Sequence, residues 1–271
     1  YIFILKLYLK IGTEMLNFIH ISDSHILNNP LATLNGIETY FSLEQTIKDC
    51  LKKFPKVDFI ICTGDISQTG ERKSYEIFHS IIKKYNVPFY SVPGNHDSPQ
   101  ELRNIISTSP VENISKIEFD KFNLILMSSV VKGENYGFIT KKCLHQLKEI
   151  LDEKKLPIIA LHHPPLNINS KWLDNLGLRN KDNFLEIIND VRKRVLILSG
   201  HIHQEADVAL GKISIIATPS TCYQFQSKID HPEITRLNPK YRHVQIDNYG
   251  NIETKVISVE VELEKQLLVG G

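Results

Sequence analysis

Five short segments of the chain carry aspartate, histidine and asparagine side chains at spacings that suit metal binding. They are Asp23-Ser24-His25, Gly64-Asp65, Gly94-Asn95-His96-Asp97, His162-His163 and Gly200-His201-Ile202-His203. Carboxylate, imidazole and amide oxygen ligands without a thiolate suit Mn, Fe, Zn or Ni better than a soft metal ion. Glycine directly before Asp65, Asn95 and His201 permits tight turns and a close approach of the backbone to a metal-bound phosphate. The set therefore predicts a metal centre that handles phosphate.

A purely structural role for these segments is the alternative. Gly-Asp is a common turn, and Asp-x-His and His-x-His occur in many proteins without a metal ion. The segment Gly94-Asn95-His96-Asp97 is more specific, because three of its four residues are potential ligands. The ordered series of all five segments, each placed directly after an apolar run, favours the metal centre.

The apolar runs before the five segments have the length and composition of buried strands. They span residues 16–22, 57–62, 88–92, 157–161 and 195–198. In an open α/β sheet, ligands bind at the carboxyl ends of the strands, so segments far apart in the sequence can meet at one edge. We therefore expect the five segments to converge.

Helices and further strands alternate with these runs. Apolar spacing of three and four residues predicts helices over residues 38–54 and 71–85, and further helices are expected after the caps Ser98 and Thr140 and over 181–191. Residues 116–119 and 123–129 are expected to pair as antiparallel strands, and the chain from 212 onward contains strands at 242–246 and 252–258. This order predicts two sheets packed face to face between helices.

The composition is that of a folded α/β protein without a strong electrostatic signature. The chain has 271 residues, of which 42% are hydrophobic, and its 32 basic and 31 acidic residues leave a formal charge of +1. This balance argues against nucleic acid and an anionic membrane as partners. Residues 15–271 are expected to form a single domain, and residues 1–14 an N-terminal extension outside the fold, with a weak membrane-surface segment as the alternative.

The cysteines indicate a reducing compartment. Cys50, Cys62, Cys143 and Cys222 are scattered without any CxxC pair, so they do not form a disulfide framework. No apolar run approaches the ~18 residues that a transmembrane helix needs. We therefore expect the protein to be cytoplasmic.

The ordered segments resemble the motifs of the calcineurin-like metallophosphoesterase superfamily, which run D-x-H, GD, GNH[DE], H and GH-x-H. The resemblance covers about residues 15–203. Beyond it, the sequence PSTCYQF at 219–225 resembles a stretch of the bacterial class III cyclic-nucleotide phosphodiesterases, the cAMP branch. The sequence NPKYR at 238–242 is similar to a later P-G-[YW]-R segment of that branch, with Lys240 in place of the usual glycine.

The resemblance implies a centre of two divalent metal ions in a four-layer α/β/β/α sandwich. The first ion would be held by Asp23, His25, Asp65 and His203, and the second by Asp65, Asn95, His162 and His201, with Asp65 bridging the two. Iron and manganese are favoured as the metals, and zinc, nickel and cobalt are alternatives. The resemblance also indicates a homodimer.

The implied reaction is hydrolysis of a 3′,5′-cyclic nucleotide, with cAMP favoured, to the 5′-monophosphate by a hydroxide that bridges the two ions. His96 is expected to donate a proton to the leaving oxygen, and Asn95, His96 and His203 are expected to contact the substrate. Asp97 is expected to orient His96, brace the loop or cap the following helix. Another phosphodiester or a phosphomonoester is the alternative substrate, and a non-catalytic scaffold is the remote alternative.

The other six histidines lack a comparable motif. His20, His79 and His145 lie on expected strands and helices, and His163 could brace the site from beside a ligand. His231 and His243 lie near the C-terminal segments that the resemblance singles out. Trp172 lies in a polar stretch, residues 167–180, that forms either a rim of the pocket or part of the core.

Overall fold

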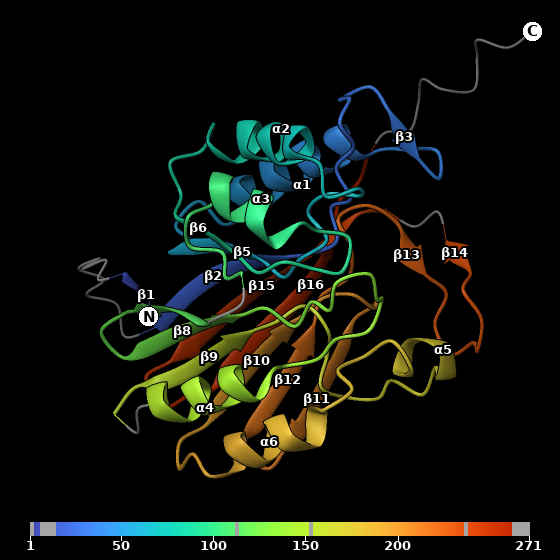
Figure 1. Cartoon of the computed structure of the whole chain (residues 1–271). Coiled ribbons are helices and arrows are strands. Elements are labelled where there is room, and N and C mark those ends of the chain that lie inside the picture. Colours follow the sequence, from blue (N-terminus) through green and yellow to red (C-terminus); the bar gives the residue numbers. More distant parts are fainter. Residues whose placement is uncertain (1–2, 6–14, 112–113, 152–153, 236–237, 262–271) are drawn as a thin grey trace, which may run out of the picture.

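Two mixed β-sheets pack face to face in the computed structural model, which describes residues 3–5, 15–111, 114–151, 154–235 and 238–261 (Figure 1). The larger sheet has the order β1 (Phe3–Leu5), β7 (Ile114–Glu118), β8 (Phe122–Met127), β9 (Leu156–Ala160), β10 (Val195–Ser199), β12 (Ile213–Ala217) and β11 (Ala206–Leu210). The smaller sheet has the order β16 (Ile252–Ser258), β15 (Lys240–Asp247), β2 (Met15–Ile21), β5 (Phe59–Cys62) and β6 (Phe89–Ser91).

Helices cover the outer face of each sheet. The smaller sheet is covered by α1 (Thr39–Lys53), α2 (Arg72–Ile82) and α3 (Pro99–Ile105), and the larger one by α4 (Lys141–Ile150) and α6 (Lys181–Asn189) (Figure 1). The short helix α5 (Lys171–Asp174) lies apart, beside the hairpin of β13 (Gln224–Phe225) and β14 (Ile234–Thr235). A second small hairpin joins β3 (Thr33–Leu34) and β4 (Ile37–Glu38). The expected four-layer α/β/β/α sandwich is confirmed.

Three apolar layers hold the sandwich together. Strand β2 shows how one sheet serves two of them, because successive side chains of a strand point to opposite faces. Leu16 and Phe18 belong to the layer between the sheets, whereas Ile19 and Ile21 pack against the helices of the smaller sheet. Both faces of the central strands are therefore buried, which explains why their sequences read as continuous apolar runs.

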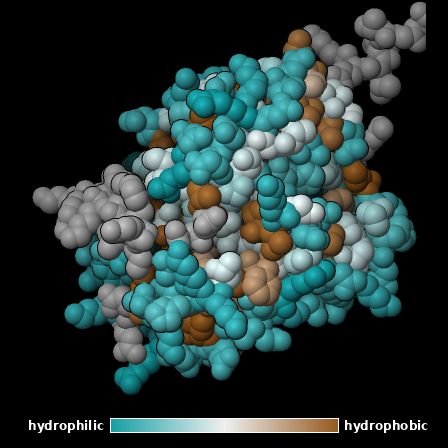
Figure 2. Space-filling view, viewed as in Figure 1, coloured by the Kyte–Doolittle hydropathy of each residue, from teal (hydrophilic) through white to brown (hydrophobic). Residues whose placement is uncertain are grey.

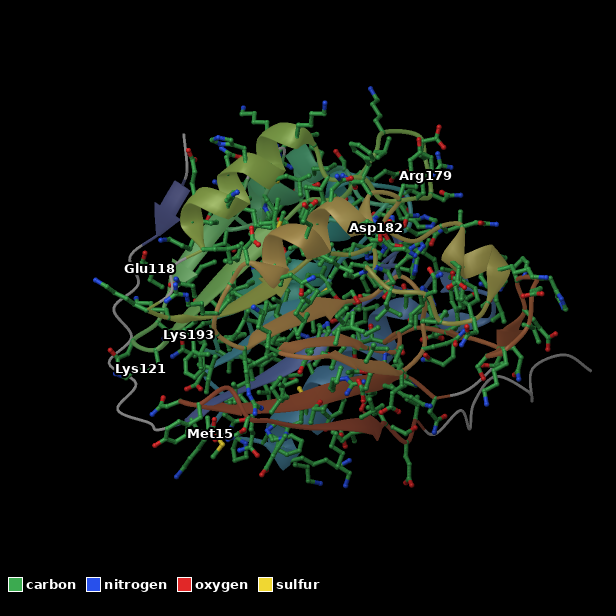
Figure 3. The ribbon with its side chains drawn as sticks, turned by 90° about the horizontal axis from the view of Figure 1, so that it is seen from below. Met15, Glu118, Lys121, Arg179, Asp182 and Lys193 are labelled. Atoms are coloured by element: carbon green, nitrogen blue, oxygen red, sulfur yellow. The ribbon has the colours of Figure 1, made fainter. Side chains whose placement is uncertain are left out.

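The strands that lead into the five segments point their carboxyl ends toward one edge of the molecule, although both sheets also contain antiparallel strands. Strands β2, β5 and β6 are parallel, and so are β8, β9, β10 and β12. Met15 begins β2, and Lys121 and Lys193 lie just before β8 and β10; all three are on one side of Figure 3, whereas Arg179 is on the other. The loops that follow the strands therefore gather at the Arg179 side.

Both helix caps predicted from the sequence are confirmed. The Ser98 hydroxyl accepts a hydrogen bond from the backbone N–H of Glu101, with Pro99 in the first helical turn. The Thr140 hydroxyl accepts one from the N–H of Cys143. These side chains satisfy N–H groups that have no partner within the helix, which fixes where each helix begins.

The sequence did not predict β11, α5 or the two small hairpins. Strand β1 pairs in parallel with β7, so residues 3–5 of the expected N-terminal extension lie on the edge of the larger sheet. The other residues of that extension lie outside the described part of the chain. Within the described residues, no helix combines the length and the apolar character needed to cross a membrane.

Candidate metal centre

All seven predicted metal ligands meet at the strand ends. The residues after β2, β5 and β6 come from the smaller sheet, and those after β9 and β10 from the larger one. The aspartates and histidines among them are almost fully buried, with at most 7% of each residue exposed: Asp23, His25, Asp65, His162, His201 and His203. Asn95 is half-buried. Buried polar groups in such number require partners or a metal ion.

One group of ligand atoms surrounds the Nε2 atom of His203. It lies 3.3 Å from Asp23 Oδ1 and 3.2 Å from His25 Nε2. His25 Nε2 in turn lies 3.9 Å from Asp65 Oδ2. These are the four side chains expected to hold the first metal ion.

A second group surrounds the Nε2 atom of His162. It lies 3.1 Å from Asn95 Oδ1, 3.2 Å from His201 Nδ1 and 3.4 Å from Asp65 Oδ2. Asp65 Oδ2 therefore approaches both groups, as expected for a carboxylate that bridges two ions.

The protonation of two imidazoles follows from the carbonyl groups behind them. His162 Nδ1 donates to the carbonyl of Thr63 at 2.7 Å, and His203 Nδ1 donates to that of Tyr223 at 2.8 Å. A carbonyl can only accept, so Nδ1 carries a proton and, in the neutral ring, Nε2 presents a lone pair to the centre. Lone pairs and carboxylate oxygens that converge in a buried space fit a cation. The residues present thus fit the metal ions that the motifs imply.

The pKa values show which ligands are ready to bind a metal ion. Burial opposes the charge of Asp23, but His203 outweighs it and lowers the pKa of this carboxyl to about 2. Burial lowers the pKa of His25 to about 4 and that of His201 to about 3, so both rings are neutral at pH 7. For His162, burial is outweighed by Asp65, which raises the pKa to about 9. Metal binding must therefore displace a proton from His162.

The backbone at the ligands is held in a sparsely populated conformation. Five of the ligands have φ in the left-handed region, at 54° for Asp23, 47° for His25, 48° for Asp65, 69° for His201 and 49° for His203. Residues other than glycine seldom adopt this region, and such strain gathers at functional sites. Hydrogen bonds between the loops hold it in place: Asp23 N–H donates to the carbonyl of Gly64, and His25 N–H to that of Asp65.

Two glycines let the loops approach each other. A Cβ atom on Gly94 would lie 2.1 Å from Asp65 Oδ1, and one on Gly64 would lie 2.6 Å from His162 Nδ1. Gly64 also has φ +101°, which disfavours any side chain. Both glycines are thus required for the close contact between ligand-bearing loops.

His96 lies at the edge of the centre. Its N–H donates to Asp65 Oδ1 at 2.9 Å, and its Nδ1 bonds to the carbonyl of Gln68 at 3.0 Å. Its ring meets that of His25 edge-on, with centroids 5.0 Å apart. The side chain is half-buried, unlike the histidine ligands, as a group that must reach a substrate should be.

Asp97 braces the loop, and the expectation that it orients His96 is wrong. One carboxylate oxygen accepts from the N–H of Ser67 and the hydroxyl of Tyr75, and the other from the N–H groups of Ile66 and Gly94. The Gln68 carbonyl orients the His96 ring instead, and Ser98 caps α3. Asp97 is therefore a positioning residue that ties the Gly64-Asp65 loop to the Gly94-Asn95 loop.

The remaining histidines divide between the interior and the surface. His163 is buried, bonds to the Ser129 hydroxyl at 2.8 Å and lies with its ring centroid 4.6 Å from that of His201, which suits the bracing role expected for it. His243 stacks on Phe54 and bonds to Asn17 near the start of β2, away from the centre. His79, His145 and His231 are exposed.

The PSTCYQF segment supports the metal-binding loops, a role that the sequence did not reveal. The Ser220 hydroxyl donates to the carbonyl of Asp23 at 2.7 Å, and the Thr221 hydroxyl bonds to that of Ser24 at 3.0 Å. The ring of His203 packs against those of both Tyr223 and Phe225, with centroids 4.7 and 4.5 Å away. This segment therefore fixes both the Asp23 loop and the His203 ring.

Comparison with known proteins agrees with this geometry. Residues 16–205 match the family model described as calcineurin-like phosphoesterase. The chain belongs to the calcineurin-like phosphoesterase family. It is 30% identical to the 3′,5′-cyclic adenosine monophosphate phosphodiesterase CpdA of Pseudomonas aeruginosa, over 89% of both chains. It is 33% identical to a 3′,5′-cyclic-nucleotide phosphodiesterase of Nostoc, over 90% of this chain and 92% of the relative. Family and relatives together identify a metal-dependent phosphodiesterase.

Solved structures share the fold at low identity. A dimetal phosphatase from Danio rerio superimposes with a TM-score of 0.62 at 15% identity, over 90% of this chain and 99% of the other. A protein described as the anchor in the inner membrane complex of Plasmodium gives 0.64 at 16% identity, over 91% and 85% of the two chains. A purple acid phosphatase from yellow lupin gives 0.58 at 12% identity, over 90% and 54%.

Proposed function

We propose that the protein hydrolyses 3′,5′-cyclic nucleotides, with cAMP favoured, to 5′-nucleoside monophosphates at a centre of two divalent metal ions. The observation that carries this proposal is the convergence of the seven ligands into two groups that share Asp65. The names of the two relatives that are about a third identical over nine-tenths of the chain support the cyclic nucleotide as the substrate.

The chain supplies the ligands and a proton donor. Asp23, His25, Asp65 and His203 would hold one ion, and Asp65, Asn95, His162 and His201 the other. Two such ions would acidify a water molecule to give the nucleophile and neutralise charge on the phosphate oxygens. The buried, hydrogen-bonded loops keep the ligands in place, so little reorganisation accompanies the reaction.

His96 is the residue we assign to the leaving oxygen. Its Nδ1 donates to the Gln68 carbonyl, which leaves Nε2 as the nitrogen that can give a proton when the ring is charged. A proton is needed there because ring opening of a 3′,5′-cyclic phosphate leaves a 3′ alkoxide. Asn95 and His203, each within a ligand group, would lie next to the bound phosphate.

The base of the nucleotide requires a wall beyond the metal ligands, because the ligands contact only the phosphate. An aromatic row leads outward from His203: Phe225 lies 4.5 Å from it, and Trp172 meets Phe225 edge-on at 4.9 Å. Phe225 and Trp172 are both half-buried, so neither residue is enclosed in the core. We assign these two rings to the nucleobase.

The fold alone does not decide between an enzyme and a scaffold, since the solved structures that share it include a protein described as an anchor. A scaffold has no need of seven converging ligands, and here all seven are present.

Iron and manganese suit this set of oxygen and nitrogen ligands, which contains no thiolate. All four cysteines are free and buried. The cytoplasmic location and the homodimer stay predictions. The face in Figure 2 is mostly hydrophilic, with apolar residues in small groups.

A hydrolysis assay with added Mn²⁺ tests the proposal. We expect turnover of cAMP to 5′-AMP, and the panel includes cGMP, bis-p-nitrophenyl phosphate and p-nitrophenyl phosphate, with chelator-treated protein as the control. Turnover of the chromogenic diester with no cyclic nucleotide hydrolysed would overturn the substrate assignment and leave the metal centre standing. Turnover of the monoester alone would favour a phosphomonoesterase.

A further inference from the structure

Gln68 contacts two functional histidines through two different atoms. It lies three residues after Asp65 and is half-buried. Its side-chain oxygen accepts from His25 Nδ1 at 2.7 Å, and its backbone carbonyl accepts from His96 Nδ1 at 3.0 Å. Its N–H donates to the carbonyl of Ile26 at 3.1 Å, which ends the row of hydrogen bonds between the Asp23 loop and the Asp65 loop.

His25 differs from His162 and His203 in the kind of group that orients its ring. His162 and His203 are oriented by the backbone carbonyls of Thr63 and Tyr223, which are present whatever side chain those residues carry. His25 is oriented by a side-chain amide that a substitution removes. When that amide oxygen accepts the Nδ1 proton, Nε2 is left unprotonated toward Asp65 and His203.

The Gln68 amide is neutral and therefore adds no charge to the site. Asp23 and Asp65 carry the negative charge among the ligands, and a neutral partner on His25 adds none. With two divalent ions bound, the centre therefore keeps a positive charge that attracts phosphate. A carboxylate at position 68 would make the His25 ring a stronger ligand and would weaken this attraction.

We propose that Gln68 is a positioning residue that holds His25 for metal binding with its side chain and His96 for proton donation with its backbone carbonyl. The metal site and the proton donor are thus linked through one residue. This inference rests on the proposed metal centre and is independent of which phosphoester is the substrate.

A Gln68→Met variant separates the contact with His25 from the contact with His96. Methionine has a similar length but lacks the amide oxygen that bonds to His25, and it keeps the backbone carbonyl that bonds to His96. We expect calorimetric titration of the chelator-treated protein to show one of two Mn²⁺ binding steps weakened by about 10–100-fold, the range found when the partner of a ligating histidine is lost. At saturating Mn²⁺, we expect kcat within about threefold of the wild type and an unchanged pH profile, because His96 keeps its partner.

Two further variants make the test specific. Gln68→Glu restores an acceptor, so we expect Mn²⁺ binding at least as tight as in the wild type, with KM raised by the added charge. Gln45→Met changes a half-buried glutamine on α1 and is expected to leave Mn²⁺ binding unchanged. Circular dichroism of each chelator-treated variant checks folding, and if Gln68→Met does not fold, Gln68→Glu carries the comparison.

Several results would overturn the proposal. Unchanged Mn²⁺ affinity in Gln68→Met would show that the amide does not hold His25. Weakened affinity in Gln68→Glu would show that the residue acts by packing rather than by accepting a hydrogen bond. If the wild type does not bind Mn²⁺, the proposed metal centre is wrong, and the role of Gln68 is overturned with it. If the wild type binds Mn²⁺ but does not hydrolyse cAMP, only the proposed substrate is overturned.

Discussion

The ligand side chains are held by groups that lie behind them. His162 and His203 each donate an Nδ1 proton to a carbonyl, and Asp65 accepts from the N–H of His96 with the oxygen that faces away from the histidine ligands. Each side chain is thus oriented before a metal ion arrives, which reduces the free energy lost on binding. Activity should therefore depend steeply on the individual ligands.

Replacing a ligand should abolish most of the activity. We expect Asn95→Ala and His201→Ala each to lower kcat by orders of magnitude, because each removes a group that lies 3.1–3.2 Å from His162 Nε2. Steady-state kinetics at saturating Mn²⁺ measure the effect. The matched control is His145→Ala on the exposed face of α4, which should keep wild-type kinetics. Near-normal turnover in either ligand variant would contradict the assignment.

The sequence predicted the residues that meet at the centre but not the groups that support them. The seven ligand residues stand in motifs, and residue type and spacing mark them. The supporting groups of His162, His203 and His96 are carbonyls of Thr63, Tyr223 and Gln68, and a backbone carbonyl leaves no mark on the residue type. For the same reason the motif did not distinguish a loop brace from a catalytic role for Asp97.

The centre depends on loops that follow parallel strands and run close together. The loop after β5 contacts the loop after β2 through backbone hydrogen bonds, and it contacts the loop after β6 at Gly94. Side chains at such crossings would separate the ligands.

Gly94→Ala tests this close approach. The new Cβ would lie 2.1 Å from Asp65 Oδ1 and 2.4 Å from its backbone nitrogen, so the carboxylate must move. We expect Mn²⁺ binding, measured by calorimetry, to be weakened at both sites that share Asp65. Gly177→Ala is the control, since its Cβ would have 3.4 Å to the nearest atom and an ordinary φ. Equal Mn²⁺ affinity in the two variants would argue against a tight crossing.

The outer aromatic row belongs to α5 and the β13–β14 hairpin, which are joined by hydrogen bonds from Ser170 to the Ile229 carbonyl and from the Lys171 N–H to Asp230. We expect Trp172→Ala to raise KM for cAMP by about 10-fold or more, given the ~1–3 kcal/mol that base stacking on an aromatic ring contributes. Its KM for bis-p-nitrophenyl phosphate should change far less. An equal rise for both substrates would indicate a general packing defect.

The strands that precede the motifs were predicted within a few residues, because both of their faces are buried and their sequences are uniformly apolar. Strand β11 escaped prediction because it lies at an edge of the larger sheet and its residues are mostly exposed. Helix α5 has four residues, too few for an apolar period to be recognised. Such elements form because neighbouring elements hold them.

The centre takes residues from both sheets, so it requires the two sheets to keep their relative position. Arg242 on β15 is fully buried, and its guanidinium bonds to Asp207 on β11 at 2.8 Å and to the carbonyl of Ala217 on β12 at 3.0 Å. These contacts join the smaller sheet to the larger one near the strand that leads from His203. Arg242 is fully buried whereas the Asp207 side chain is 46% exposed, so loss of Asp207 would leave a buried positive charge with less compensation.

His20 makes the stability of the sandwich depend on pH. It is fully buried on β2, and burial, followed by the charge of Arg242, keeps its pKa well below the usual range. Below about pH 6.5 the unfolded chain gains a proton that the folded chain does not, so the free energy of unfolding falls as the pH falls. His20→Gln removes the imidazole that takes up this proton in the unfolded chain, and it retains a polar group that can bond to the Thr63 hydroxyl.

We expect the wild type to lose more stability than His20→Gln on acidification, by about 1.4 kcal/mol per pH unit below the unfolded pKa. Urea denaturation of the chelator-treated proteins at pH 7, 6 and 5 measures the difference. Parallel pH dependence in the two proteins would show that His20 is not the group responsible.

We propose that two metal ions, held by seven side chains that share Asp65, enable this chain to hydrolyse cyclic nucleotides. The most direct test of this claim is a Mn²⁺ titration of the chelator-treated protein, followed by the rate of 5′-AMP formation from cAMP at each step. We predict that full activity requires about two bound ions per chain. Full activity with one ion per chain, or no 5′-AMP when two ions are bound, would contradict the claim.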